Sequence, residues 1–255
     1  MSRGDWTEEY EMREAQTDDI PAILTFVKNN FDWRETMLRF ARQSLVDPTR
    51  MDKARFQQMD LDLTNFVEVM VRCHSCQLFI HKASSEIVLF NARIIHQGPT
   101  LQEFLEDDSC TSTKLTTDLP QPRDPLFKAY FQFTRDTIRN AKIFQSFPRL
   151  DRAIEFVAVV VHLQHRRKGL AFYSIRESIR YSQKNNCGVM FGLFTTKYAK
   201  RSAENASLVE IHQVENILDY KDETGEKVFE NLPADSDINI MAITVDHACD
   251  KHNIY

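Results

Sequence analysis

The chain has 255 residues, of which 42% are hydrophobic and 27% are charged, and its formal net charge is −5. This composition is typical of a soluble globular protein, and the negative charge argues against a nucleic-acid-binding surface. The longest uncharged apolar stretch, residues 156–163, is far shorter than the ~20 residues that span a bilayer. The acidic N-terminus lacks the apolar segment of a secretory signal, and five irregularly spaced cysteines do not suggest a disulfide framework. We therefore expect a cytoplasmic protein without a nucleic-acid or membrane partner.

The first half of the chain predicts one strand, three helices and a hairpin. Residues 10–15 alternate as a strand does, and Thr17, two acids and Pro21 mark the start of a helix that ends near Asn30. Apolar spacing predicts further helices and a β-hairpin, in the order helix 38–45, helix 61–73, strand 78–80 and strand 87–95. Residues 98–125 are polar and predict a long loop, a candidate lid with one short helical piece at 101–105.

The second half alternates strands with helices. The predicted elements are a helix at 127–147, a strand at 153–163, a helix at 169–185, a strand at 188–194, a helix at 195–207, and strands at 208–214 and 238–245. Strands at both ends with helices between them imply a mixed sheet covered on both faces, an α/β (α+β) single domain. We expect this domain to cover residues 9–246, with a flexible N-terminus at 1–8 and a C-terminal tail at 247–255.

The most informative segment is the junction at residues 153–171. A run rich in β-branched residues, typical of a buried strand, breaks into a basic turn and then an amphipathic helix. The N-terminus of a helix presents unpaired N–H groups and the positive end of its dipole, so this turn predicts an anion site. Gly169, one of only six glycines, permits close approach of a phosphate. The alternative is an ordinary buried strand followed by a solvated basic turn.

The turn resembles the acyl-coenzyme A signature of the Gcn5-related N-acetyltransferase (GNAT) superfamily. Residues 166–171 read Arg-Arg-Lys-Gly-Leu-Ala, which matches (Gln or Arg)-x-x-Gly-x-(Gly or Ala). A dinucleotide-binding site would need a glycine triad and a P-loop would need Gly-Lys-Ser/Thr, and the chain has neither. Within the superfamily the chain is most similar to the invertebrate arylalkylamine N-acetyltransferases, through the segments Asp18-Asp-Ile-Pro-Ala-Ile, Thr195-Thr-Lys-Tyr198 and Ile238-Asn-Ile-Met.

The resemblance implies a mixed, mostly antiparallel central sheet that splits at the acyl-coenzyme A strand. It also implies acetyl-coenzyme A as co-substrate and no metal. The backbone of Val159 and Val161 would bind the pantetheine amides. The diphosphate would lie on the turn, which consists of Arg166, Arg167, Lys168, Gly169, Leu170 and Ala171.

On the acceptor side, the resemblance implies that Glu35 deprotonates the amine through water. Phe31 and Trp33 flank Glu35 and are candidate pocket residues. Asp32 is a rival base. Glu35 also has a structural explanation, because acidic residues are common in the first turn of a helix. His162 and His165, at the end of the coenzyme strand, are candidate proton relays, although outward-pointing histidines are common there.

After the fifth strand, Thr195 keeps a hydroxyl where the family has a serine, and Tyr198 is a candidate proton donor to the leaving sulfur. The second serine of the family is replaced by Ala199, and the Leu-Gly-Phe that usually follows this helix is replaced at 207–209. The resemblance implies an acetyl-coenzyme A-dependent N-acyltransferase that transfers the acyl group directly to a small primary amine in a ternary complex. These departures leave two other functions open. One is a weakened relative that binds acyl-coenzyme A without efficient turnover, and the other is a peptide or protein N-acetyltransferase.

Two further clusters have ordinary explanations. Cys73-His-Ser-Cys76 has the short spacing of a metal hook but no second hook, and a zinc site needs four ligands. The aromatic residues Phe127, Tyr130, Phe131 and Phe133 have the spacing of a core-facing helix, although they could also line an amine pocket. The sequence does not predict the acceptor amine, the acyl-chain length or the oligomeric state.

Overall fold

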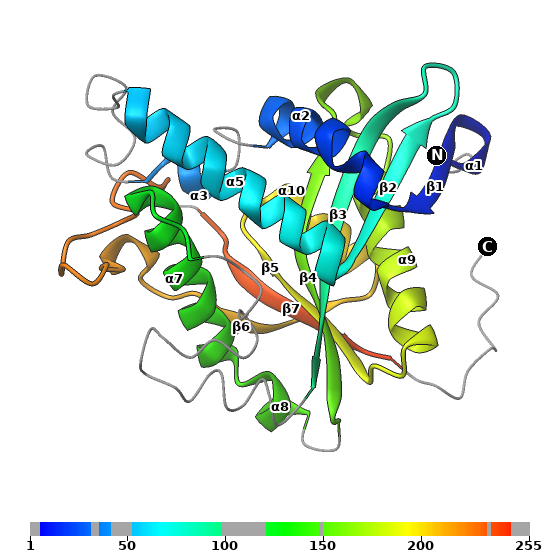
Figure 1. The fold of residues 1–255 in the computed structure, drawn as a ribbon. Helices are drawn as coiled ribbons and strands as arrows, with labels where there is room; N and C mark the ends of the chain where they lie inside the picture. The colour runs from blue at the N-terminus through cyan, green and yellow to red at the C-terminus, as the bar shows by residue number, and fades with distance from the viewer. Residues whose placement is uncertain are drawn as a thin grey trace.

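The computed structural model describes residues 6–31, 36–41, 53–97, 121–147, 150–233 and 236–245. Within these residues the strands form one seven-stranded sheet, in the order β1-β2-β3-β4-β5-β7-β6 (Figure 1). Neighbouring strands are antiparallel except for β4 and β5, which are parallel. The strands are β1 (Tyr10–Glu14), β2 (Ser75–His81), β3 (Glu86–Gln97), β4 (Arg152–Val161), β5 (Val189–Phe194), β6 (Val209–Gln213) and β7 (Asn239–Thr244). The predicted mixed, mostly antiparallel sheet is confirmed.

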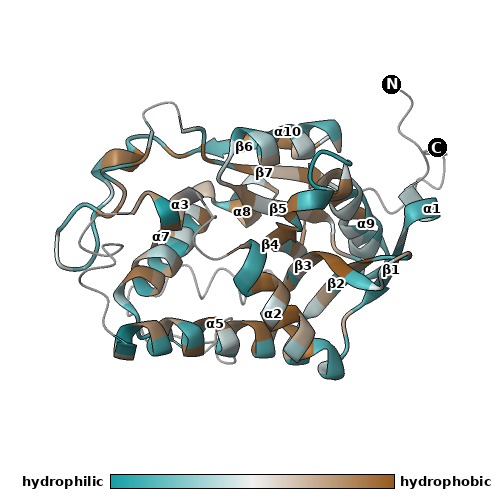
Figure 2. Cartoon of the chain, turned by 90° about the horizontal axis from the view of Figure 1, so that it is seen from above, coloured by the Kyte–Doolittle hydropathy of each residue, from teal (hydrophilic) through white to brown (hydrophobic). Residues whose placement is uncertain are grey.

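Helices cover both faces of this sheet (Figures 1 and 2). Helices α2 and α5 lie on one face, where α7 packs against β5 and β7, and α9 and α10 lie on the other. The helices are α1 (Trp6–Glu9), α2 (Ile20–Asn30), α3 (Thr36–Arg39), α5 (Lys53–Cys73), α7 (Pro125–Ala141), α8 (Ile143–Ser146), α9 (Leu170–Lys184) and α10 (Lys197–Asn205). Short 3₁₀ turns occur at Thr17–Asp19, Leu163–His165 and Ile217–Asp219.

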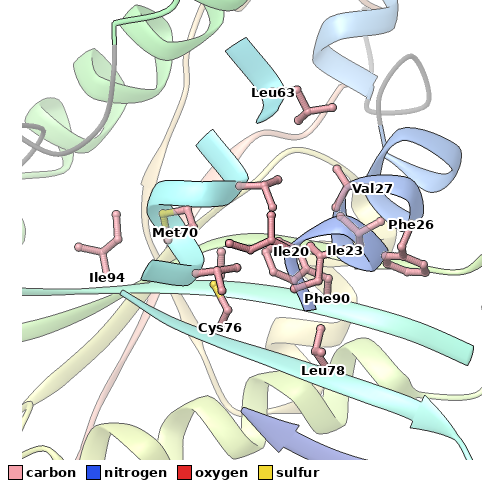
Figure 3. Packing of buried hydrophobic residues seen from close by; sticks show 14 residues of the cluster. Ile20, Ile23, Phe26, Val27, Leu63, Met70, Cys76, Leu78, Phe90 and Ile94 are labelled. Atoms are coloured by element: carbon pink, nitrogen blue, oxygen red, sulfur yellow. The ribbon is translucent and has the colours of Figure 1, made fainter. Parts of the chain in front are cut away.

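The α2–α5 layer is held by a hydrophobic cluster that the sequence periodicity predicts. Ile20, Ile23 and Val27 of α2 occupy helical spacings on one face and pack against Met70 of α5 and Phe90 of β3 (Figure 3). Full burial of a side chain of this kind contributes about 1.5–3 kcal/mol. The cluster therefore fixes α2, and with it the chain that leads to Phe31, against the sheet.

On the opposite face, α9 packs through a mixed apolar and polar surface. Leu170 and Ile175 are buried, and so are Ser174 and Ser178, whose hydroxyl oxygens accept hydrogen bonds of 2.9 and 3.0 Å from the side-chain amide of Asn91 on β3. Buried polar groups need such partners because an unsatisfied one costs about 1–3 kcal/mol. This hydrogen-bond network fixes the first half of α9 against β3.

The structure differs from the sequence prediction at two helices. The helix predicted at 127–147 is broken, because Lys142 adopts a left-handed conformation (φ 47°) that ends α7 and starts α8. The helix predicted at 61–73 begins earlier, at Lys53. The short helix predicted at 101–105 and residues 42–45 of the helix predicted at 38–45 lie outside the described residues.

The end of the predicted lid segment is anchored. The carboxylate of Asp124 caps α7 by accepting hydrogen bonds from the backbone N–H groups of Leu126 and Phe127. The same carboxylate pairs with Arg55 of α5 at 2.8 Å, and Asp62 accepts the backbone N–H of Asp124 at 2.7 Å. Residues 121–124 are thus fixed to α5, whereas the rest of the candidate lid, residues 98–120, lies outside the described residues.

Candidate acyl-coenzyme A and amine site

Strands β4 and β5 pair over only part of their length. The parallel ladder joins residues 153–156 to residues 189–192 and ends at Phe156 and Gly192. Beyond that point, β4 remains paired with β3 through Val161, and β5 remains paired with β7 through Phe194. A Cβ atom on Gly192 would lie 2.9 Å from the backbone oxygen of Phe156, so a glycine is required where the strands meet. We call the diverging part, residues 157–161 of β4 and 193–194 of β5, the strand fork.

The edge of β4 that faces away from β3 carries the backbone groups of Val159 and Val161. His162 donates its backbone N–H to Val88 of β3 at 2.9 Å. Because backbone groups alternate in direction along an antiparallel ladder, those of Val161 and Val159 are directed to the other edge. The carbonyl of Val161 accepts a hydrogen bond from Arg166 Nε at 3.3 Å, which agrees with this direction. The predicted pantetheine-binding backbone therefore lies on the fork side of β4.

The turn after β4 has the backbone geometry of an anion cradle. Arg167 (φ 66°) and Gly169 (φ 83°) adopt left-handed conformations that flank Lys168. The first hydrogen bond of α9 runs from Tyr173 N–H to the carbonyl of Gly169, and the backbone N–H groups of residues 167–171 donate to no described residue. Successive free N–H groups in this conformation, at the N-terminus of a helix, form a concave anion site. The turn therefore fits the diphosphate that the sequence predicts there.

The basic side chains of the turn have separate partners. Arg166 donates to Val161 and, through Nη2, to the carbonyl of Asn30 at the end of α2, at 3.5 Å. Lys168 Nζ donates to Glu9 Oε1 at 2.7 Å and lies 5.8 Å from the ring centre of Tyr10. Glu9 of the N-terminal segment therefore partly neutralises the charge of Lys168, whereas the backbone N–H groups of the turn remain available to a ligand.

Residues 6–10 pack directly on the turn and α9. The ring of Trp6 lies 5.6 Å from that of Tyr173, and the hydroxyl of Tyr10 lies 3.0 Å from His165 Nδ1. Residues 6–8, which the sequence assigns to a flexible terminus, form part of helix α1 in the structure. His165 is buried rather than outward-pointing, and its burial, followed by the charge of Lys168 and the nearby His81 and His162, lowers its pKa.

Replacing Glu9 tests whether this contact competes with acyl-coenzyme A. The hydrogen bond and charge of Lys168 lower the pKa of Glu9, and Glu9 raises the pKa of Lys168. The Glu9–Lys168 attraction is therefore present above the usual pKa of a glutamate and is lost as the pH falls through the lowered pKa. At pH 7 we expect Glu9→Gln to release Lys168 and tighten acyl-coenzyme A binding by up to about fivefold, since exposed pairs contribute about 0.2–1 kcal/mol. Calorimetric dissociation constants measure the change, with Glu8→Gln as control; an unchanged constant for Glu9→Gln would contradict the competition.

Gly169→Ala should reduce both stability and acyl-coenzyme A affinity. The left-handed conformation costs an alanine about 1–2 kcal/mol, and the new Cβ would lie 3.3 Å from Tyr173. Gly225→Ala is a matched control, because Gly225 has a similar φ of 80° but nothing within 4 Å of its added Cβ. We expect both variants to lower the free energy of unfolding, measured by urea titration, and only Gly169→Ala to weaken acyl-coenzyme A binding.

The structure describes only some of the residues that the sequence predicts on the acceptor side. Trp33 and Glu35 lie outside the described residues. Phe31 directly follows α2 and packs against both the α2–α5 cluster and the cluster formed by α3, α7 and residues 217–238. Thr195 directly follows β5 at the open end of the fork, and Tyr198 lies on α10 with its side chain 78% exposed. The structure therefore places Phe31 between the two clusters, and Tyr198 at the protein surface.

The aromatic residues of α7 divide into two groups. Phe127 and Phe133 are buried in the core, as their spacing predicts. Tyr130 and Phe131 are only partly buried, and Phe131 lies 5.7 Å from Phe66 of α5, ring centre to ring centre. Tyr130 and Phe131 are therefore aromatic residues of α7 that the core does not fully bury.

Sequence reasoning missed a buried pair, His96 of β3 and Glu155 of β4. Nε2 of the histidine lies 2.7 Å from Oε2 of the glutamate. The signal was a single acidic residue within an otherwise apolar strand, which requires a buried partner. The partner could not be identified because the pairing register of β3 and β4 contains a bulge.

The cysteine cluster and the helices give no sign of a metal site or a membrane span within the described residues. Cys73 is exposed at the end of α5, whereas Cys76 is buried in β2, where burial raises its thiol pKa to about 12. No group of three or more His, Cys, Asp or Glu side chains in the described part of the chain is arranged to hold a metal ion. Among the described helices, none combines the length and the hydropathy needed to cross a membrane.

Several solved structures with the same fold are N-acetyltransferases by name. No protein-family model matches the chain, and no curated protein matches it. A mosquito arylalkylamine N-acetyltransferase-like 5b is 18% identical, with a TM-score of 0.67 over 92% of this chain and 99% of the other. Arylalkylamine N-acetyltransferase 2 from Aedes aegypti is 18% identical, with a TM-score of 0.63 over 93% and 99%. The polyamine N-acetyltransferase of Drosophila melanogaster, which forms N-acetylagmatine, is 12% identical, with a TM-score of 0.65 over 92% and 100%. The chain has the GNAT fold of these arylalkylamine and polyamine N-acetyltransferases.

Proposed function

We propose that this protein is an acetyl-coenzyme A-dependent N-acyltransferase that acts on a small primary amine by direct transfer in a ternary complex. One observation carries the proposal: within the described residues, segment 157–171 combines a strand edge without a strand partner, a turn whose backbone N–H groups at 167–171 have no partner, and the N-terminus of a helix. The fold shared with arylalkylamine and polyamine N-acetyltransferases supports it. We expect the protein to act in the cytoplasm, with reduced cysteines.

On the donor side, the backbone supplies most of the recognition. The N–H groups of residues 167–171 bind the diphosphate, and the backbone of Val159 and Val161 pairs with the two amides of the pantetheine arm as a neighbouring strand would. This arrangement holds the thioester in the strand fork, facing the amine. Holding two reactants in line supplies about 7 kcal/mol of barrier reduction at the low end of measured effective molarities.

On the acceptor side, Glu35 accepts a proton from the ammonium group of the substrate, since only the neutral amine is nucleophilic. Phe31 and Trp33 contact the apolar part of the amine. Thr195 and Tyr198 donate hydrogen bonds toward the leaving sulfur.

A second function is favoured by one specific observation. Ala199 has no hydroxyl where the family has its second serine, and the nearby hydroxyl oxygen of Thr196 is held at the start of α10, where it accepts the N–H of Ala199 at 3.1 Å. A chain with fewer proton donors at this end of β5 fits a protein that binds acyl-coenzyme A without efficient turnover. A peptide or protein N-acetyltransferase is a third function, which an open acceptor groove would favour over a closed aromatic site.

Calorimetry followed by a turnover assay separates these functions. Acetyl-coenzyme A is first titrated into the protein, and a panel of phenylethylamine, tryptamine, agmatine, spermidine and an N-terminally free peptide is then assayed for release of free thiol. We expect binding and thiol release with at least one small amine. Binding without release on any acceptor supports the second function, release with the peptide alone supports the third, and absence of binding contradicts all three.

A further inference from the structure

Three histidines that the proposed mechanism does not use meet beside the diphosphate-binding turn. His81 ends β2, His162 follows β4, and His165 ends the 3₁₀ turn Leu163–His165. The ring centre of His165 lies 4.9 Å from that of His81 and 5.5 Å from that of His162. Because β2 and β4 both pair antiparallel with β3, they finish at the same end of the sheet, which brings the three rings together. We call these three side chains the imidazole cluster.

The middle ring of the cluster lies close to the anion cradle. His165 precedes Arg167, the first residue of the cradle, by two positions, and two residues span at most about 7 Å. Leu170, the first residue of α9, is buried in the same hydrophobic cluster as Tyr10 of β1. An anion held by the backbone N–H groups of residues 167–171 is therefore near enough to His165 for its charge to be only partly screened.

The surroundings of His165 disfavour its charged form in the ligand-free protein. The residue is 9% exposed, and burial is the largest cause of its lowered pKa, followed by the charges of Lys168, His81 and His162. The carboxylate of Glu9 acts on the pKa in the opposite direction and more weakly. Among the described residues, these are the charged groups that act on His165, and they come from α1, β2, the end of β4 and the turn. An anion on the turn would supply the negative charge that this setting lacks.

The hydroxyl of Tyr10 can follow His165 through a change of protonation state. It lies 3.0 Å from His165 Nδ1. A phenol can donate to a neutral imidazole and accept from an imidazolium, since it carries both a proton and lone pairs. The same hydroxyl interacts with Glu9, whose half-exposed carboxylate pairs with Lys168. A protonated His165 therefore keeps a hydrogen-bond partner, and Tyr10 and Glu9 link it to solvent.

The other two imidazoles are less suited to take up a proton when the turn is occupied. His162 Nδ1 accepts the backbone N–H of Gln164 at 3.3 Å, so protonation of that nitrogen would break the hydrogen bond. His81 Nδ1 lies 2.9 Å from Ser84 Oγ in the β2–β3 hairpin, and His81 belongs to β2 rather than to the segment that forms the turn. His165 is thus the ring of the cluster that combines proximity to the turn with a partner for both protonation states.

We propose that acyl-coenzyme A binding is coupled to the uptake of one proton by His165, which becomes an imidazolium when the diphosphate occupies the turn. The proton comes from solvent and adds to the lone pair of the ring nitrogen, and no bond between heavy atoms forms or breaks. His165 acts through the turn rather than by touching the reacting atoms, so it is a positioning residue. The affinity for the ligand then rises as the pH falls through the pKa of His165 in the complex, and it levels off below the lower pKa of the free protein.

Dephospho-coenzyme A is the probe that isolates this effect. It keeps the diphosphate but lacks the 3′-phosphate, whose own titration near pH ~6 would add to that of the protein. Calorimetry at pH 6 in two buffers of different ionisation enthalpy counts the protons taken up on binding. We expect net uptake of a fraction of a proton at pH 6. The dissociation constant should be about threefold to tenfold lower at pH 5.5 than at pH 8, which corresponds to a pKa change of about half a unit to one unit.

Matched variants locate the proton. His165→Gln keeps a hydrogen-bonding side chain and should remove most of the proton uptake, while binding at pH 8 changes little. Tyr10→Phe removes the acceptor for the imidazolium and should move the rise in affinity to lower pH. His212→Gln is the control, because His212 belongs to β6, at the opposite edge of the sheet from β1, and it should leave the uptake unchanged.

A spectroscopic readout separates the proposed role from a merely structural one. The imidazole signals of His165, identified by their absence in His165→Gln, should titrate at a higher pH in the dephospho-coenzyme A complex than in the free protein. Melting temperatures show whether each variant is folded. A folded His165→Gln variant that takes up as many protons as the wild type would overturn the inference, and so would wild-type binding without proton uptake.

The inference rests on the donor side of the proposed function, and its test needs no turnover. If no amine is acylated but dephospho-coenzyme A binds with proton uptake at His165, the proposed function fails while the inference stands. If amines are acylated but the probe binds without proton uptake, the inference fails while the proposed function stands.

Discussion

Ala171→Asp is expected to abolish most acyl-coenzyme A binding while leaving the protein at least as stable as the wild type. Ala171 is the second residue of α9 and is only partly buried, so an aspartate side chain fits without repacking the core. A carboxylate in the first turn of a helix stabilises it by about 0.3–1 kcal/mol. The same carboxylate repels the diphosphate that we assign to this turn, and two like charges 4 Å apart near a surface repel by about 4 kcal/mol before salt screening.

We therefore expect the dissociation constant of acetyl-coenzyme A to rise by about 30-fold to 100-fold, measured by calorimetry, and the melting temperature to stay constant or rise. Ala171→Asn has the same size without the charge, and it should bind within about threefold of the wild type. Equal affinities for the two variants would show that the diphosphate does not lie on this turn. Higher salt should reduce the difference between the dissociation constants of the two variants.

Glu35→Gln should lower kcat by about a hundredfold at neutral pH, if Glu35 is the main base of the amine reaction. The variant keeps the shape of the side chain and loses its ability to accept a proton. Its rate should recover as the pH rises toward the pKa of the amine, because the solution then supplies the neutral amine directly. Steady-state rates between pH 6 and 10, with saturating acetyl-coenzyme A, measure both effects.

Asp32→Asn serves as the comparison, since Asp32 is the rival base in the same segment. A larger loss with Asp32→Asn than with Glu35→Gln would transfer the role to Asp32, and an unchanged rate and pH profile in Glu35→Gln would remove Glu35 from the mechanism.

The sheet and the donor-side turn could be predicted because local pattern and global fold agree there. The β-branched run before Gly169 and the helical spacing after it are signals carried by adjacent residues, and the structure confirms both β4 and α9. The break at Lys142 could not be predicted in the same way. Its left-handed conformation is adopted by a lysine, whereas the usual sequence signal for such a helix end is a glycine.

Contacts between segments far apart in sequence were harder to predict than the elements themselves. The sequence shows Lys168 only as a basic residue of the turn, because its partner Glu9 lies 159 positions earlier in the chain. Glu155 and His96 meet only through the register of two antiparallel strands with a bulge between Ala92 and Arg93. A shift of one residue in that register would move one of the two side chains to the opposite face of the sheet.

The central claim is that acetyl-coenzyme A bound on the turn and fork transfers its acetyl group to a small primary amine. Its most direct test is to incubate the protein with acetyl-coenzyme A labelled with ¹³C in the acetyl group and the amine panel, and to detect products by mass spectrometry. We predict a labelled N-acetyl amine formed in equal amount to the free coenzyme A, and a much smaller yield from Ala171→Asp at subsaturating donor. Absence of any labelled amide under conditions where calorimetry shows bound acetyl-coenzyme A would contradict the claim.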